Sequence, residues 1–150
     1  AYSLISLSRA AKPLMNDGGS IIALTYLGGE MYVPNYNIMG VAKAALESSV
    51  RYLSAEFGSI GVRVNALSAG PVKTLAFKGI AGSDVLLKIN KYRSPMKRNI
   101  TLEEVGSAGL YLASSLSSGV TGETHHVDGG VHCVAISKED AKYYLDVDVK

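Results

Sequence analysis

The sequence predicts an α/β fold in which helices cover both faces of a doubly wound parallel sheet, and three observations carry this prediction. Segments with apolar residues at helical spacing alternate with short, β-branched apolar runs. Turns rich in glycine, asparagine and aspartate separate these segments. The resulting order of helix, strand, helix, strand, helix, strand is typical of parallel strands that are joined by crossover helices.

Each predicted element has its own local signal. Apolar residues recur at helical spacing from Ile38 to Leu53, and Gly58 follows where a helix commonly ends. Thr101 and Glu104 have the spacing of a capping box, which predicts a helix start. The expected helices cover residues 1–16, 34–58, about 85–92 and 102–115, and the expected strands cover 20–25, 62–67 and 124–127.

The composition indicates one domain with an ample core. The chain has 150 residues, of which 47% are hydrophobic. No apolar run reaches the ~18 residues that suggest a membrane helix. The net charge of +2 is too small to suggest nucleic acid or an anionic membrane as a partner, and the single Cys133 fits a reducing compartment. We therefore expect a cytoplasmic protein with no nucleic-acid or membrane partner.

Tyr36 and Lys43 lie near the start of the predicted long helix. Because they are seven residues apart, their side chains are expected on one helix face with Cα atoms about 10 Å apart. A phenol and an ammonium in this arrangement suit an acid and its supporting cation, although such pairs also arise by chance. Tyr26 and the loop over residues 68–74 each follow a predicted strand, where parallel sheets bind ligands. The presence of Tyr26 and this loop beside Tyr36 and Lys43 favours a catalytic site.

Several motifs together resemble the short-chain dehydrogenase/reductase superfamily, and within it the bacterial NADH-dependent enoyl-[acyl-carrier-protein] reductases. The resemblance spans about Tyr2 to Ile136. It implies a Rossmann-like fold of which residues 1–136 form the C-terminal half and residues 137–150 a polar C-terminal tail or peripheral helix. The motifs are Leu24-Thr-Tyr-Leu-Gly28, Pro34-Asn-Tyr-Asn-x-Met-Gly-x-Ala-Lys43, Gly61-Val-Arg-Val-Asn-Ala-x-Ser-Ala-Gly-Pro71-x-x-Thr-Leu-Ala76 and Gly122-Glu-x-x-x-Val-Asp-Gly-Gly130.

The spacing of these residues separates two branches of the superfamily. Members that reduce ketones have a serine and a tyrosine at fixed distances before the lysine, and this chain has Tyr26 and Met39 at those places. Enoyl reductases instead have the tyrosine one turn earlier, as Tyr36 stands here. This displacement suits hydride delivery to the β-carbon, since charge then develops on the more distant thioester oxygen. A ketone or alcohol dehydrogenase therefore remains the less favoured enzyme.

The resemblance also implies the roles of individual residues. Tyr36 is expected to hydrogen-bond the developing enolate, and Lys43 to hold the nicotinamide ribose of NADH. Tyr26 is expected in the catalytic site, either as a participant or as an aromatic residue at its rim. The remaining cofactor contacts are expected at Ala69, Gly70, Pro71, Val72, Thr74 and Ala76, and the remaining substrate contacts at Met39, Ile80 and Leu86.

Residues 77–87 correspond to the mobile substrate loop of the resembled family. Gly79 and Gly82 permit hinge motion there, and Ile80 and Leu86 could cover an acyl chain. Ser83 departs from the phenylalanine that is common at its place in the family. The resemblance therefore does not determine how this loop packs or which acyl-chain length the protein prefers.

The histidines do not predict a metal site. His125 and His126 are neighbours on a predicted strand, so their side chains point to opposite faces, and Asp128-Gly-Gly130 separates them from His132 and Cys133. We expect no metal.

The glycine-rich phosphate loop of the resembled family is not found in these residues. We therefore expect a fragment of a reductase about twice as long, inactive by itself and homotetrameric when complete, whose substrate is an enoyl thioester linked to acyl carrier protein. The alternative is a non-catalytic remnant that serves as an interaction or structural module.

Overall fold

The computed structural model describes residues 1–15, 18–74, 77 and 83–145. The helices are α1 (Tyr2–Ala11), α2 (Asn37–Gly58), α4 (Ser83–Arg93), α5 (Leu102–Ala113) and α6 (Lys138–Leu145). The strands are β1 (Gly19–Thr25), β2 (Val62–Ala69) and β3 (Thr124–Val127). Short 3-10 turns η1 (Lys12–Leu14), η2 (Leu27–Gly29), η3 (Ser115–Ser117) and η4 (Val131–Cys133) complete the described elements.

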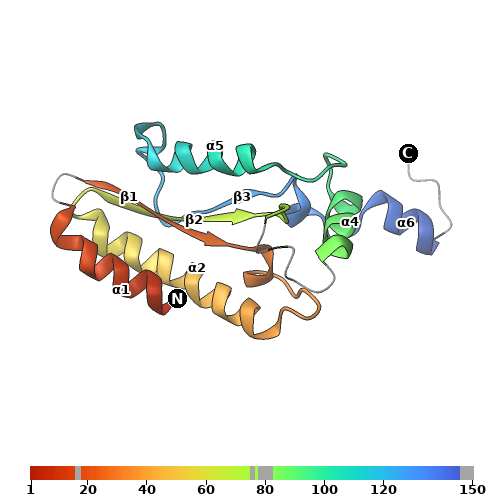
Figure 1. The fold of residues 1–150 in the computed structure, drawn as a ribbon, viewed down its shortest axis with the longest axis horizontal. Coiled ribbons are helices and arrows are strands. Elements are labelled where there is room, and N and C mark those ends of the chain that lie inside the picture. Colours follow the sequence, from red (N-terminus) through yellow and green to blue (C-terminus); the bar gives the residue numbers. More distant parts are fainter. Residues whose placement is uncertain (16–17, 75–76, 78–82, 146–150) are drawn as a thin grey trace.

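The sheet confirms the predicted α/β architecture. Its three strands are parallel and lie in the order β1-β2-β3, with Gly19 opposite Val62 and Ala66 opposite Thr124. Helices α1 and α2 cover one face and α5 covers the other, while α4 and α6 lie beyond the end of the sheet to which the strands point (Figure 1). The carboxyl ends of all three strands therefore meet near α4.

The core lies between the sheet and the α1–α2 layer. Val50 and Phe57 of α2 pack there against Ala23 of β1 and Val62 and Val64 of β2, all nearly or fully buried. On the opposite face, Arg63 of β2 donates hydrogen bonds to the carbonyl oxygens of Leu112 and Ser114 at the end of α5. These bonds satisfy carbonyls that have no partner inside the helix.

The side chain of Asn65, a buried polar residue of β2, is also hydrogen-bonded. The amide of Asn65, which is fully buried, donates to the carbonyl oxygen of Val120 and accepts from the N–H of Glu123. These bonds attach the segment before β3 to the central strand, which fixes where β3 begins.

Two predicted helix boundaries are wrong. Helix α2 begins at Asn37 rather than at residue 34, because Asn35 adopts a left-handed backbone conformation with φ of 62° and Tyr36 is the N-cap. Helix α1 ends at Ala11 rather than near residue 16, since Pro13 has no N–H to continue the helical hydrogen bonds. The strand boundaries differ less, with β2 running two residues beyond its predicted end to Ala69.

The other predicted elements are confirmed. Thr101 caps α5 in a capping box with Glu104, and β3 has the predicted bounds. Within the described part of the chain, none of the helices combines the length and the apolar character that crossing a bilayer requires.

Candidate functional site

The candidate site is a cavity of about 660 Å³ at the carboxyl ends of β1 and β2. The segment after β1, the start of α2, the loop after β2 and helix α4 all contribute to its wall. Its lining residues are Tyr26, Val33, Pro34, Asn35, Tyr36, Gly70, Pro71, Val72, Thr74, Phe77, Val85, Leu86 and Ile89. The wall is largely apolar and carries a few polar groups, as is usual for pockets that bind small molecules.

Two phenols meet in the wall of this cavity. The rings of Tyr26 and Tyr36 pack edge to face, with centroids 5.2 Å apart and planes at 75°. Burial raises the pKa of Tyr26, and the neighbouring Tyr36 raises it further, while burial alone raises the pKa of Tyr36. Both phenols therefore stay protonated at neutral pH and can donate a hydrogen bond.

Tyr26 is held by a tight turn that packs closely on α2. The N–H of Gly29 donates to the carbonyl oxygen of Tyr26 at 2.8 Å, and Tyr26 is the N-cap of η2. A Cβ on Gly28 would lie 2.4 Å from the Tyr36 ring, and a Cβ on Gly40 would lie 2.7 Å from the carbonyl oxygen of Gly28. Glycine at these two positions lets the turn approach α2 closely enough for the two tyrosine rings to touch.

Lys43 and Glu47 connect α2 to the end of β1. The Lys43 ammonium donates to the carbonyl oxygen of Leu24 at 2.9 Å. One turn further along α2, the buried Glu47 carboxylate accepts a hydrogen bond from the hydroxyl of Thr25 at 2.5 Å. The last two residues of β1, which directly precede Tyr26, are thus held by α2, whose N-cap is Tyr36.

The loop after β2 begins with a backbone hydrogen bond to the last residue of β3. The N–H of Gly70 donates to the carbonyl oxygen of Val127, so the pairing of β2 with β3 continues past Ala69. A Cβ on Gly70 would lie 3.1 Å from the Cα of Asp128, so the loop lies directly against the segment after β3. The Thr74 hydroxyl accepts from the N–H of Phe77 at 3.1 Å and retains its own hydrogen for another acceptor.

Most of the predicted site residues that the structure describes come together here. Tyr26, Tyr36, Gly70, Pro71, Val72, Thr74 and Leu86 line the main cavity, and Ala69 lines an adjoining one of about 110 Å³. Lys43 lies on α2, whose N-cap is Tyr36, and does not itself line either cavity. Met39 is half exposed and is not among the residues that line either cavity. Ala76 and Ile80 lie outside the described residues.

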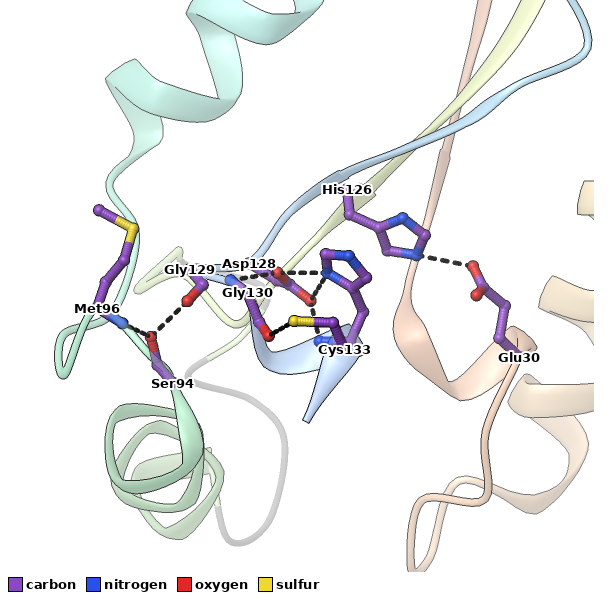
Figure 2. A network of polar contacts seen from close by, with 9 residues as sticks. Glu30, Ser94, Met96, His126, Asp128, Gly129, Gly130 and Cys133 are labelled. Atoms are coloured by element: carbon purple, nitrogen blue, oxygen red, sulfur yellow. Dashed lines mark hydrogen bonds and ion pairs between the residues drawn. The ribbon is translucent and has the colours of Figure 1, made fainter. Parts of the chain in front are cut away.

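Glu30, Glu47 and His126 do not line the two cavities, but they take part in contacts with the segment that carries Tyr26, and the sequence did not single them out for this role. His126 contacts the Glu30 carboxylate at 2.8 Å (Figure 2), whereas the ring of His125 faces Tyr111 of α5. Their opposite directions confirm the predicted alternation along the strand. The spacing of Glu47, four residues after Lys43, is the one signal that could have placed it on the same helix face.

Comparisons with known proteins agree with this geometry. A family model described as "Enoyl-(Acyl carrier protein) reductase" matches residues 1–132. The chain is 57% identical over 140 residues to enoyl-[acyl-carrier-protein] reductase [NADH] 1 of Rhizobium meliloti, covering 93% of this chain and 52% of the relative. It is 58% identical over 137 residues to the corresponding NADH enzyme of Rickettsia typhi, covering 91% of this chain and 52% of that protein.

Solved structures show the same fold. FabI from Candidatus Liberibacter asiaticus superposes with a TM-score of 0.88 at 47% identity, covering 91% of this chain and 53% of the other. The Anaplasma phagocytophilum reductase in complex with NAD superposes with a TM-score of 0.87 at 54% identity, covering 91% and 52%. The chain spans about half the length of the curated relatives it matches. On the family match and these identities, the chain belongs to the enoyl-[acyl-carrier-protein] reductase family.

Proposed function

We propose that this chain forms the C-terminal half of a reductase about twice as long, which uses NADH to reduce the double bond of a trans-2-enoyl thioester carried by acyl carrier protein. The reaction would serve fatty acid biosynthesis. The observation that carries the proposal is the edge-to-face pair of Tyr26 and Tyr36 in the cavity wall, with Tyr36 at the N-cap of the helix that bears Lys43. The non-catalytic alternative offers no reason for two partly buried phenols to line a cavity of this size.

The cavity and its neighbouring residues suit a nicotinamide cofactor. The Lys43 ammonium has three hydrogens, and one of them is directed at the carbonyl oxygen of Leu24, so two can serve the hydroxyls of a ribose. Gly70, Pro71 and Val72 would hold the nicotinamide end, and the Thr74 hydroxyl would donate to the pyrophosphate. Bound there, NADH would supply the hydride.

Tyr36 then stabilises the charge that the reaction creates on the substrate. Hydride addition at the β-carbon moves negative charge to the thioester oxygen, and a phenol that is still protonated can donate a hydrogen bond to this oxygen. Removal of a donor of this kind costs about 3–4 kcal/mol of transition-state stabilisation. Tyr26, whose ring packs edge to face on the ring of Tyr36, holds that ring in place and also lines the cavity.

The proposal is tested with the full-length reductase, by following NADH oxidation with crotonyl and longer enoyl thioesters and with acetoacetyl thioester. Only the enoyl thioesters should turn over at a useful rate, because Met39 offers no proton where ketone reducers have their tyrosine. Tyr36→Phe should lower kcat more than it raises KM, since the lost hydrogen bond matters mainly as the enolate forms. Faster turnover of the keto substrate would overturn the proposal.

Tyr52→Phe is the matched control for this substitution. Tyr52 lies on the same helix as Lys43 and its side chain is largely exposed. Loss of the same phenol oxygen there should leave kcat and KM unchanged.

We also propose that the full-length reductase is a cytoplasmic homotetramer. The apolar segment from Gly130 to Ile136 begins with the buried Val131 and ends with Ile136, whose side chain is 73% exposed. An exposed apolar side chain at the end of such a segment suits a contact with another subunit. Light scattering of the active enzyme gives the test, and a monomeric mass would contradict the proposal.

A further inference from the structure

The turn that carries Tyr26 has a second attachment, on the side away from α2. Glu30, four residues after Tyr26, contacts Nε2 of His126 on β3 at 2.8 Å (Figure 2). The His126 side chain is 16% exposed and that of Glu30 is 36% exposed. A carboxylate can only accept a hydrogen bond, so Nε2 of His126 carries the hydrogen.

The side chain of His126 is also held by a contact with His132. Its ring stacks on the ring of His132, with centroids 4.1 Å apart and planes at 18°. The His132 ring contacts the carboxylate of Asp128 through Nδ1 at 3.0 Å, and this buried carboxylate also accepts the N–H groups of Gly130 and His132. The contact with Glu30 therefore rests on a segment that is fixed by several hydrogen bonds.

The geometry of the turn transmits this contact to Tyr26. The N–H of Glu30 donates to the carbonyl oxygen of Leu27 at 3.0 Å, and the N–H of Gly29 donates to that of Tyr26. These bonds make the turn a single short helical unit whose N-cap is Tyr26 and whose C-cap is Glu30. Its first end is held through Thr25 and Glu47, so the contact of Glu30 with His126 holds the other end.

We propose that Glu30 and His126 are positioning residues, which tie the turn to β3 and thereby keep Tyr26 against Tyr36 in the cavity wall. The idea rests on the proposed enoyl reduction for its kinetic consequence only. Without the tie, the turn can move away from the cavity, whereas Lys43 and the loop after β2 keep their places. The value of kcat/KM for the substrate should therefore fall, whereas the affinity for NADH should be unchanged.

Two substitutions of His126 distinguish the effect of its hydrogen bond from the effect of its ring. His126→Phe keeps a ring that can stack on His132 and removes the donor, whereas His126→Gln keeps an N–H donor at a similar reach and removes the ring. In the full-length reductase, His126→Phe should lower kcat/KM for an enoyl thioester by about tenfold, since small misplacements of site groups have effects of this order or larger. His126→Gln should restore most of that loss, and the dissociation constant for NADH should be unchanged in both.

A reciprocal pair of variants tests the partner side of the contact. Glu30→Gln retains an oxygen that can accept from Nε2 of His126, and Glu30→Ala does not. The alanine variant should behave like His126→Phe, and the glutamine variant should stay close to the unsubstituted protein. His125→Phe is the control, because it makes the same change on the same strand, where the side chain faces Tyr111.

Hydrogen–deuterium exchange gives a readout that needs no enzymatic activity. Peptides over residues 26–33 should exchange faster in His126→Phe and Glu30→Ala, with protection returning in the two glutamine variants. Equal exchange and equal kinetics in all variants would overturn the proposal. An equal loss of kcat/KM in His126→Phe and His126→Gln would also overturn it. If the unsubstituted protein fails to reduce enoyl thioesters, the proposed function fails, and the exchange data still decide whether the tie exists.

Discussion

Gly40 offers a sharp test of how closely the Tyr26 turn packs on α2. It lies in the first part of the helix, and a Cβ built on it would come 2.7 Å from the carbonyl oxygen of Gly28. That oxygen belongs to the backbone of the turn, so it cannot rotate away as a side-chain end could. In Gly40→Ala the turn must therefore shift, together with Tyr26 at its start.

Two opposing effects set the expected magnitude. Alanine is favoured over glycine inside a helix by about 1 kcal/mol. Insertion of a methyl group into a tightly packed site costs about 1–3 kcal/mol. Gly40→Ala should therefore leave the free energy of unfolding about 1 kcal/mol lower, within a range of roughly 0–2 kcal/mol.

Gly106 is the matched control. It lies inside α5, and a Cβ there would meet no atom within 4 Å. Gly106→Ala should therefore stabilise the protein by up to about 1 kcal/mol, because only the helix preference remains. The two variants make the same chemical change in two helices and are expected to shift stability in opposite directions.

The assay is urea unfolding of the full-length protein at matched concentration, with enoyl thioester reduction measured in parallel. Gly40→Ala should lower the midpoint of unfolding and kcat/KM, whereas Gly106→Ala should raise the midpoint and leave activity unchanged. Equal stabilisation by both substitutions would refute the close approach of the turn to α2, and with it the reasoning that places Tyr26 through this contact.

Three further predictions follow from the same structure. Lys43→Met should raise the dissociation constant for NADH in the full-length reductase, because the ribose loses its cationic donor, and fluorescence titration of NADH measures this change. The 150-residue chain by itself should bind NADH weakly or not at all, and micromolar binding in calorimetry would contradict our view that the pyrophosphate site needs the other half. Hydrogen bonds from Arg98 and from the N–H of Thr101 lower the pKa of Glu104 from 4.5 to about 2. A carboxylate whose pKa is lower in the folded state contributes stability above its unfolded pKa, and this contribution is lost as the pH falls toward 2. The urea midpoint of unfolding should therefore decrease as the pH is lowered from about 5, and it should decrease less in Glu104→Gln.

Much of the fold could be predicted from the sequence because its signals are local. The capping box of Thr101 and Glu104 needs only four consecutive residues, and it is present as predicted. The bounds of β3 follow from a short run between glycine-containing turns. Where a local signal was overlooked, as at Pro13 and Asn35, the predicted helix ends were wrong.

The residues that build the candidate site could be predicted in part, for a related reason. Tyr26, Tyr36 and Lys43 form a pattern within one short stretch, and parallel strands place the carboxyl ends of β1 and β2 at the same edge of the sheet. Met39 belongs to the same stretch but does not line either cavity, since a place in a motif does not determine where a side chain points.

Only the tertiary structure decided how the site is held in place. Glu30 and His126 are 96 residues apart in the chain, and nothing local to either one indicates the other. They meet because β1 and β3 both pair with β2 in parallel, with Thr25 and His126 each opposite Ser68, so the turn after β1 comes near His126 only once the sheet has formed. The types of chemical groups can be recognised in the sequence, whereas contacts between distant segments depend on strand order and register, which arise from packing of the whole chain.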